Sequence, residues 1–207
     1  MKKVLFCAAA AVLAAVTVFG PAQADDMKGS KKGATIGAEA PNFTLTDTDG
    51  NSHTLADLKG KVVVLEWFNP TCPYVVKHHE KNPTMKTTYA KYKDQDVVWL
   101  AINSGAEGKK GSSKEENAAA KAKWGIEYPV LLDADGSVGK SYGARTTPHM
   151  FVIDAEGTLV YAGAIDNDRR KLGDVNYVDK ALGEVLAGKD VTDATSKPYG
   201  CSVKYSN

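Results

Sequence analysis

The chain has 207 residues, of which 43% are hydrophobic and 25% are charged, and its formal net charge at pH 7 is +1. A chain of this length and composition can bury one good core, so we expect a single domain. A near-neutral balance without a basic cluster argues against a nucleic-acid-binding protein and against a protein that binds membrane surfaces through charge.

The first 24 residues have the pattern of a secretory signal peptide. Lys2 and Lys3 begin an apolar run over residues 4–20, and Ala22-Gln23-Ala24 is a small-residue cleavage site. We predict that this segment is removed, that the protein is exported to the periplasm or secreted, and that no stable membrane insertion remains after cleavage. An uncleaved anchor is the alternative. Loss of the two lysines changes the net charge to −1.

Cleavage of the leader also removes Cys7 and leaves two cysteines, Cys72 and Cys201. An exported protein works where disulfides form and persist. Two cysteines are too few for a disulfide scaffold, but they are the right number for one redox couple.

The predicted elements alternate between strands and helices after a flexible lead-in over residues 25–36. Strands are predicted at about residues 43–47, 53–55, 62–68, 96–102, 129–133, 149–154 and 158–163. Helices are predicted at about residues 74–92, 113–124, 136–143 and 173–186. This order predicts an α/β sandwich with a mixed central sheet over residues 37–187, followed by a polar tail over residues 188–207.

Local signals support several of these elements. Asp49-Gly50 is a strong hairpin turn signal between the first two strands. Pro83 should kink or break the first helix, because proline lacks the N–H that helix interiors need. Ser113 and Glu116 have the spacing of a capping box at the start of the second helix.

Cys72 lies where a buried strand ends and a helix begins. The strand stops at the turn Asn69-Pro70, Thr71 is the predicted N-cap, and Pro73 suits the first helical turn. Unpaired backbone N–H groups and the positive end of the helix dipole favour a thiolate there. We therefore predict that Cys72 is a reactive cysteine; the alternative is a small buried thiol that only packs.

Three blocks of this sequence resemble the redoxin branch of the thioredoxin-like proteins. That group includes peroxiredoxins of the alkyl hydroperoxide reductase and thiol-specific antioxidant type, and exported thiol–disulfide oxidoreductases. The resemblance covers about residues 35–187 and implies a thioredoxin-like sandwich in which Thr147 and Pro148 form the cis-proline loop. The blocks are Ala40-Pro41-x-Phe43-x-Leu45 with Asp49-Gly50, Leu58-Lys59-Gly60-Lys61-Val62-Val63-Val64-Leu65, and Thr147-Pro148 before Val152-Ile153-Asp154.

The chain departs from the motifs of both branches. A thioredoxin-type site is Cys-x-x-Cys, but the third residue after Cys72 is Val75. Peroxiredoxins carry Pro-x-x-x-Thr/Ser-x-x-Cys, and here Leu65 and Asn69 occupy the motif positions, with Arg145 only near the place of the peroxiredoxin arginine. The usual donors that stabilise developing charge on a peroxide are therefore missing.

The sequence thus predicts an exported thiol–disulfide oxidoreductase or peroxiredoxin-like antioxidant protein. Its expected partner is a thiol- or disulfide-bearing protein or a small thiol, with peroxide as a further candidate substrate. A thiol peroxidase proper is one alternative. The other is a redox-inert or copper-binding thioredoxin-like module. No phosphate-binding glycine loop, persuasive Ser-His-Asp spacing or zinc signature is found, so we expect no cofactor and no metal.

The sequence around Cys201, Tyr-Gly-Cys-Ser-Val-Lys-Tyr, resembles the tail of a peroxiredoxin-like subgroup of exported proteins. Our hypothesis is that the Cys72 thiolate attacks a disulfide or becomes a sulfenic acid, and that Cys201, on a tail able to move, closes an intramolecular disulfide. One alternative is a permanent Cys72–Cys201 bond that acts as a structural staple. The other is a pair of free thiols with no partnership.

Two further positions are expected to support the site. Glu66 lies in the apolar strand, where an ionised carboxylate is costly to bury. Thioredoxins carry a buried acid at the corresponding spacing, and the resemblance implies a similar role in proton transfer; a solvated glutamate at a sheet edge is the alternative. Pro148 should be cis, and the backbone of this loop could pair with an extended substrate. An ordinary trans proline is its alternative.

Three histidines raise the copper alternative. Exported copper chaperones of related fold use two cysteines and a histidine. His78 and His79 are adjacent and so should point to different faces of the helix, while His149 could tune Cys72 if its loop packs against the thiol.

Overall fold

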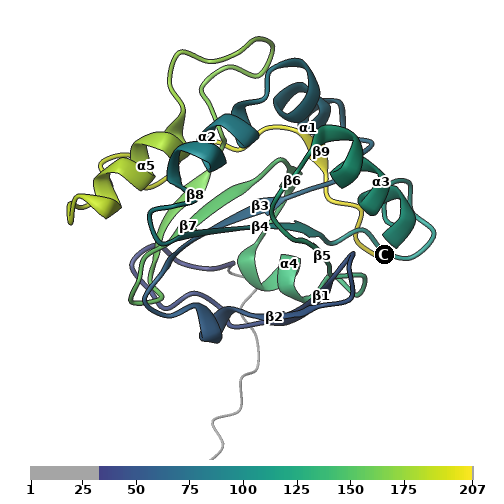
Figure 1. The fold of residues 1–207 in the computed structure, drawn as a ribbon, viewed down its shortest axis with the longest axis horizontal. Helices are drawn as coiled ribbons and strands as arrows, with labels where there is room; N and C mark the ends of the chain where they lie inside the picture. The colour runs from purple at the N-terminus through teal and green to yellow at the C-terminus, as the bar shows by residue number, and fades with distance from the viewer. Residues whose placement is uncertain (1–32, 207) are drawn as a thin grey trace, which may run out of the picture. The chain divides into compact units, whose positions relative to one another are not determined.

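The structure, a computed structural model, describes residues 33–206. The signal peptide and most of the lead-in predicted from the sequence lie outside these residues. The described part of the chain forms a seven-stranded mixed sheet with helices on both faces (Figure 1). Its strands, in spatial order across the sheet, are β2 (Ser52–Thr54), β1 (Thr44–Asp47), β5 (Val130–Leu132), β4 (Val97–Asn103), β3 (Val62–Trp67), β7 (Met150–Ile153) and β8 (Leu159–Gly163).

The helices divide between the two faces of the sheet. α4 lies on one face, and the other longer helices lie on the opposite face or at its end (Figure 1). The helical segments are η1 (Leu55–Leu58), α1 (Pro73–Val76), the π-helical η2 (Lys77–Lys81), α2 (Thr84–Tyr92), α3 (Lys114–Trp124), α4 (Ser137–Tyr142) and α5 (Tyr177–Leu186). The predicted α/β sandwich is confirmed.

β3 lies at the centre and is buried along its whole length, because it pairs parallel with β4 and antiparallel with β7. Alternate side chains of a strand point to opposite faces. Val62 and Val64 therefore join the core cluster that contains Cys72, which α1, α2, α3 and α5 cover. Val63 and Leu65 join a second cluster under α4 and the segment before β1.

The local sequence signals give the observed boundaries in most places. Asp49-Gly50 lies in the turn between β1 and β2, and the helical run after Cys72 breaks at Pro83. Ser113 and Glu116 form the predicted capping box. The last helix begins at Tyr177 and not near Gly173, because the Asn176 side chain caps it by accepting a hydrogen bond from the Asp179 N–H.

The two ends of the described chain both contact the domain. Ala34 and Ile36, which the sequence placed in a flexible lead-in, pack against the second core cluster. At the other end, β9 (Cys201–Ser202) pairs antiparallel with β6 (Thr146–Thr147), the strand just before the cis-proline. Within residues 33–206, no helix combines the length and the apolar character needed to cross a membrane.

The tail does not extend away from the domain. The Val203 N–H donates to the Arg145 carbonyl, and the Tyr205 hydroxyl donates to the Ala144 carbonyl at 2.8 Å. The sequence predicted a polar tail able to move, but its aromatic residues find partners in the domain and hold it in place.

Candidate active site

The turn after β3 fixes the backbone of Cys72. The side-chain oxygen of Asn69 accepts hydrogen bonds from the Thr71 N–H at 2.9 Å and from the Thr71 hydroxyl at 2.8 Å. Cys72 itself is the residue that precedes the helix, with extended backbone angles, and Pro73 begins α1. The prediction that Thr71 is the N-cap is therefore wrong, because Asn69 engages both Thr71 groups in a local turn.

The Cys72 thiol is buried against the cis-proline loop. Its side chain is 3% exposed, and the Sγ donates a hydrogen bond to the Thr147 carbonyl oxygen at 2.9 Å. The Thr147–Pro148 peptide bond is cis, as predicted. The backbone of this loop therefore contacts the sulfur directly, and the predicted trio of Cys72, Thr147 and Pro148 is assembled in one place.

Cys201 completes the group. It lies opposite Thr147 in the β6–β9 pair, and its side chain packs against the core cluster that contains Cys72. Burial first, and then the nearby Cys72 thiol, raise the pKa of Cys201 to about 11. Both cysteines are free thiols in this structure. Two cysteines far apart in sequence therefore meet at one surface of the site.

Glu66 is buried below the helix that follows Cys72. Its carboxylate accepts hydrogen bonds from Trp99 Nε1 at 3.1 Å and from the Tyr128 hydroxyl at 3.0 Å, and His79 Nε2 lies 2.7 Å from its other oxygen. The solvated alternative is wrong, because the residue is fully buried. Among residues 33–206, these are the hydrogen-bond partners of the Glu66 side chain, and neither cysteine is one of them.

The three histidines have separate environments. His79 contacts Glu66, whereas His78 Nε2 lies 2.9 Å from the Tyr199 hydroxyl, so the two adjacent rings do point apart. His149 packs on Phe151, in the core cluster on the opposite face from Cys72, so it does not contact the thiol. Burial lowers its pKa to about 4. In the described chain, no group of three or more His, Cys, Asp or Glu residues could hold a metal ion.

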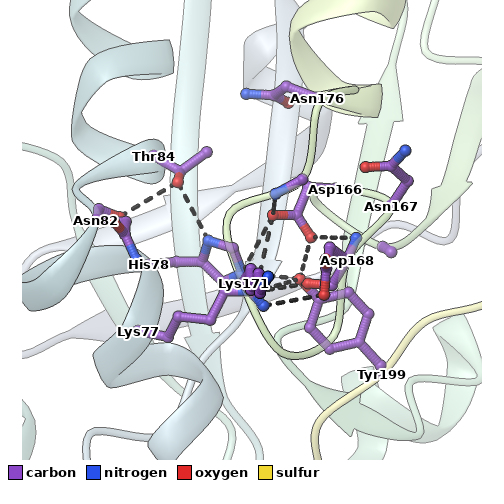
Figure 2. Close-up of polar contacts among 12 residues, drawn as sticks. Lys77, His78, Asn82, Thr84, Asp166, Asn167, Asp168, Lys171, Asn176 and Tyr199 are labelled. Carbon is purple, nitrogen blue, oxygen red and sulfur yellow. Dashed lines mark hydrogen bonds and ion pairs between the residues drawn. The ribbon is translucent and has the colours of Figure 1, made fainter.

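One cluster near the site was not foreseen from the sequence. Lys77, His78, Asp166 and Tyr199, here called the Tyr199 cluster, join through the Tyr199 hydroxyl (Figure 2). The sequence named His78 only as a metal candidate and predicted no polar contact for Tyr199. The one signal in the sequence for this cluster was the position of Tyr199, two residues before Cys201. The contact with Asp166 could not be read from the sequence, because it forms only when distant segments fold together.

Comparison with known proteins places the chain in a family. The family model described as Redoxin matches residues 35–182. The chain is 31% identical over 159 residues to the thiol-disulfide oxidoreductase ResA of Bacillus subtilis, an alignment that covers 77% of this chain and 84% of that protein.

Solved structures agree in fold. The crystal structure of a hypothetical protein from Sinorhizobium meliloti 1021 matches with a TM-score of 0.76 and 32% identity, over 84% of this chain and 97% of that one. That of a putative thiol:disulfide interchange protein from Chlorobium tepidum matches with a TM-score of 0.57 and 23% identity, over 75% of this chain and 97% of that one. At that identity the second match bears on the fold alone, which is thioredoxin-like.

Proposed function

The chain belongs to the Redoxin family, and on that premise we propose that it is an exported thiol–disulfide oxidoreductase with Cys72 as nucleophile and Cys201 as resolving cysteine. The observation that carries this proposal is that both cysteines meet the cis-proline loop at Thr147, Cys72 through its thiol hydrogen bond and Cys201 through the β6–β9 pair. The proposed partner is a protein or small molecule that bears a thiol or a disulfide.

The reaction balances with these two sulfurs alone. The Cys72 thiolate attacks one sulfur of a substrate disulfide, forms a mixed disulfide and releases one substrate thiolate, which takes up a proton. Cys201 then loses its proton and attacks the Cys72 sulfur, which releases the second substrate thiolate. The substrate gains two electrons, and the protein keeps a Cys72–Cys201 disulfide. The same steps in reverse oxidise a dithiol substrate.

The neighbouring residues have supporting roles in this scheme. The Thr147 carbonyl holds the thiol hydrogen of Cys72, and buried Pro148 fixes the direction of that carbonyl. Thr71 stabilises the turn before the nucleophile through Asn69. Glu66 acts indirectly, because His79 on η2 ties the helical segment after Cys72 to the central strand. We propose this positioning role for Glu66 in place of direct proton transfer.

Reduction of a protein disulfide, with insulin as the substrate and dithiothreitol as the donor, tests the proposal. Cys72→Ser should remove the catalysed rate. Cys201→Ser, treated with oxidised glutathione, should accumulate a glutathione adduct on Cys72, whereas the wild-type protein should convert to the intramolecular disulfide. Equal rates for the wild type and Cys72→Ser would exclude Cys72 as the nucleophile.

The same preparation separates the alternatives. Consumption of hydrogen peroxide far faster than disulfide exchange would favour a thiol peroxidase. Tight Cu(I) binding that is lost in Cys72→Ser would favour a copper-binding module. Export predicts a mature chain that begins at Asp25, which the intact mass of protein recovered from the periplasm or the medium checks.

A further inference from the structure

The Tyr199 hydroxyl is saturated with hydrogen-bond partners. It donates to Asp166 Oδ1, and it lies 3.2 Å from Lys77 Nζ and 2.9 Å from His78 Nε2 (Figure 2). A hydroxyl group offers one donor and two acceptor sites, so three neighbours are the most that it can engage. Lys77 Nζ also lies 5.1 Å from the centre of the Tyr199 ring, which adds a cation–π contact. This tyrosine is therefore held by an aspartate, a lysine and a histidine from two other segments of the chain.

The cluster connects the nucleophile helix to the tail. Lys77 and His78 follow Cys72 on the same helical run, across α1 into η2. Asp166 lies in the loop after β8, and Tyr199 lies two residues before Cys201. The three segments meet in one buried place, because Lys77, His78 and Asp166 are all buried. A single residue separates Tyr199 from Cys201.

That intervening residue, Gly200, fits closely against the cis-proline loop. Its φ of +151° and its contact with the Thr147 carbonyl leave no room for a side chain, since a Cβ would meet that oxygen. The tail therefore follows one path between Tyr199 and Cys201. The path leads to Cys201, which packs against the core cluster that contains the nucleophile, itself only 3% exposed.

We propose that Tyr199 is a positioning residue whose hydroxyl, bound in the Tyr199 cluster, places Cys201 on Cys72 and keeps the tail over the nucleophile. The part that concerns resolution rests on the function proposed above. A thiol held in the reacting position attacks the neighbouring sulfur far more readily than the same thiol on a free chain, and so competes better with thiols from solution. Loss of the hydrogen bonds to the Tyr199 hydroxyl would make attack by Cys201 on Cys72 less favourable, and would expose Cys72 to thiols and disulfides in solution.

Tyr199→Phe is the direct test. It removes the hydroxyl but keeps the ring, which packs edge-on against Tyr74 with centroids 5.9 Å apart. Asp166 retains the Gly173 and Asp168 N–H groups, so the change leaves no carboxylate without partners. Tyr92→Phe is the matched control, because it also removes a hydroxyl from a buried ring, and that hydroxyl donates to the Asp179 carbonyl and not to the Tyr199 cluster.

Two measurements report the position of the tail. In the reduced protein, alkylation of Cys72 by iodoacetamide, located by peptide mass spectrometry, should be at least ~10-fold faster in Tyr199→Phe. At equilibrium with glutathione, the constant for closing the Cys72–Cys201 disulfide should fall at least ~10-fold, which is about 30 mV in reduction potential. Tyr92→Phe should match the wild type in the alkylation rate and in the equilibrium constant. A purely structural tyrosine would lower the melting temperature and leave both values unchanged.

The outcomes separate this proposal from the one it rests on. Unchanged alkylation and unchanged equilibrium in a folded Tyr199→Phe would overturn the role of Tyr199. If the wild type never forms the disulfide, Cys201 is not a resolving cysteine, and the alkylation rate alone tests the role of Tyr199. Faster alkylation of Cys72 in Tyr199→Phe then supports Tyr199 as the residue that keeps Cys72 covered. Equal alkylation rates overturn that role. Gly200→Ala displaces the same segment without touching the cluster and should act in the same direction, which keeps the test decisive if Tyr199→Phe folds poorly.

Discussion

At the scale of single residues, the setting of Cys72 determines what can reach it. The thiol is buried, its hydrogen is bonded to the Thr147 carbonyl, and Cys201 is the neighbouring thiol. A sulfur in this setting reacts with a group that is already beside it or with one that displaces the tail. The proposed reaction therefore depends on Cys201 as much as on Cys72.

Glu66 carries a stability prediction at the same scale. Replacement by alanine removes the acceptor for Trp99 and Tyr128 and the partner of His79, all inside the core. Loss of one member of such a buried network costs about 3 kcal/mol or more in the free energy of unfolding. Urea denaturation measures this loss. Glu39→Ala, which removes an exposed carboxylate that lies 3.9 Å from Lys59, is the control and should change little. Equal effects would contradict the account of Glu66.

The sequence identifies most residues of the candidate site. Its two errors, at Thr71 and Tyr199, share one cause, which is that side-chain partners are set by the folded structure. Cys72, Cys201, Thr147 and Pro148 were found from motifs and spacing, and they do lie together. Thr71 was misplaced because Asn69 competes for the same hydroxyl and N–H group, which spacing alone does not show. The partners of Tyr199 were missed because residues 77, 166 and 199 meet only in the folded chain.

At the scale of elements, α3 shows what local sequence can establish. The Ser113 side chain accepts from the Glu116 N–H, and the Glu116 side chain accepts from the Ser113 N–H, which satisfies two donors at the helix start. Ser113→Ala should lower the free energy of unfolding by about 1 kcal/mol. Thermal or urea unfolding checks this, with Ser112→Ala as the control one residue earlier. A loss as large in the control would contradict the capping account.

The β6–β9 pair is the opposite case. Each strand has two residues, too few for an alternating pattern, and the pairing joins segments more than 50 residues apart. Sequence periodicity indicates which face of a strand is buried, but it does not name the partner of a strand this short. For this reason the sequence predicted a tail able to move, whereas the structure holds that tail along the cis-proline loop.

At the scale of the whole molecule, the order of strands and helices was the most predictable feature. Continuous apolar runs marked the central strands because they are buried on both faces, and the turn at Asn69-Pro70 marked the end of β3. Three sequence blocks in the right order then indicated the thioredoxin-like arrangement, which the family match and the structural likeness support.

The folded protein should lose stability in mild acid. Burial lowers the pKa of His149 from 6.5 to about 4, with the charge of Arg145 adding to the effect, and burial lowers the pKa of His78 to about 4 against the attraction of Asp166. Between these values the unfolded chain binds more protons than the folded one, so stability rises with pH across this window. The contribution is full above pH 6.5 and is lost as the pH falls toward 4.

Each of these histidines is worth on the order of 3 kcal/mol over that range. Urea denaturation at pH 7, 5.5 and 4 should show the free energy of unfolding falling with pH. His149→Gln, which removes one of the two groups, should show a shallower decline. Stability that stays constant or rises toward pH 4 would contradict the buried, neutral state of both rings.

The most direct test of the central claim is thiol trapping and mass spectrometry of the mature, non-reduced protein across a glutathione redox series. We predict that the Cys72–Cys201 disulfide forms and opens at a potential of about −120 to −230 mV, the range of exported and other thiol–disulfide oxidoreductases. A bond that stays closed below about −300 mV would make it a structural staple. Two cysteines that never pair would contradict the redox couple altogether.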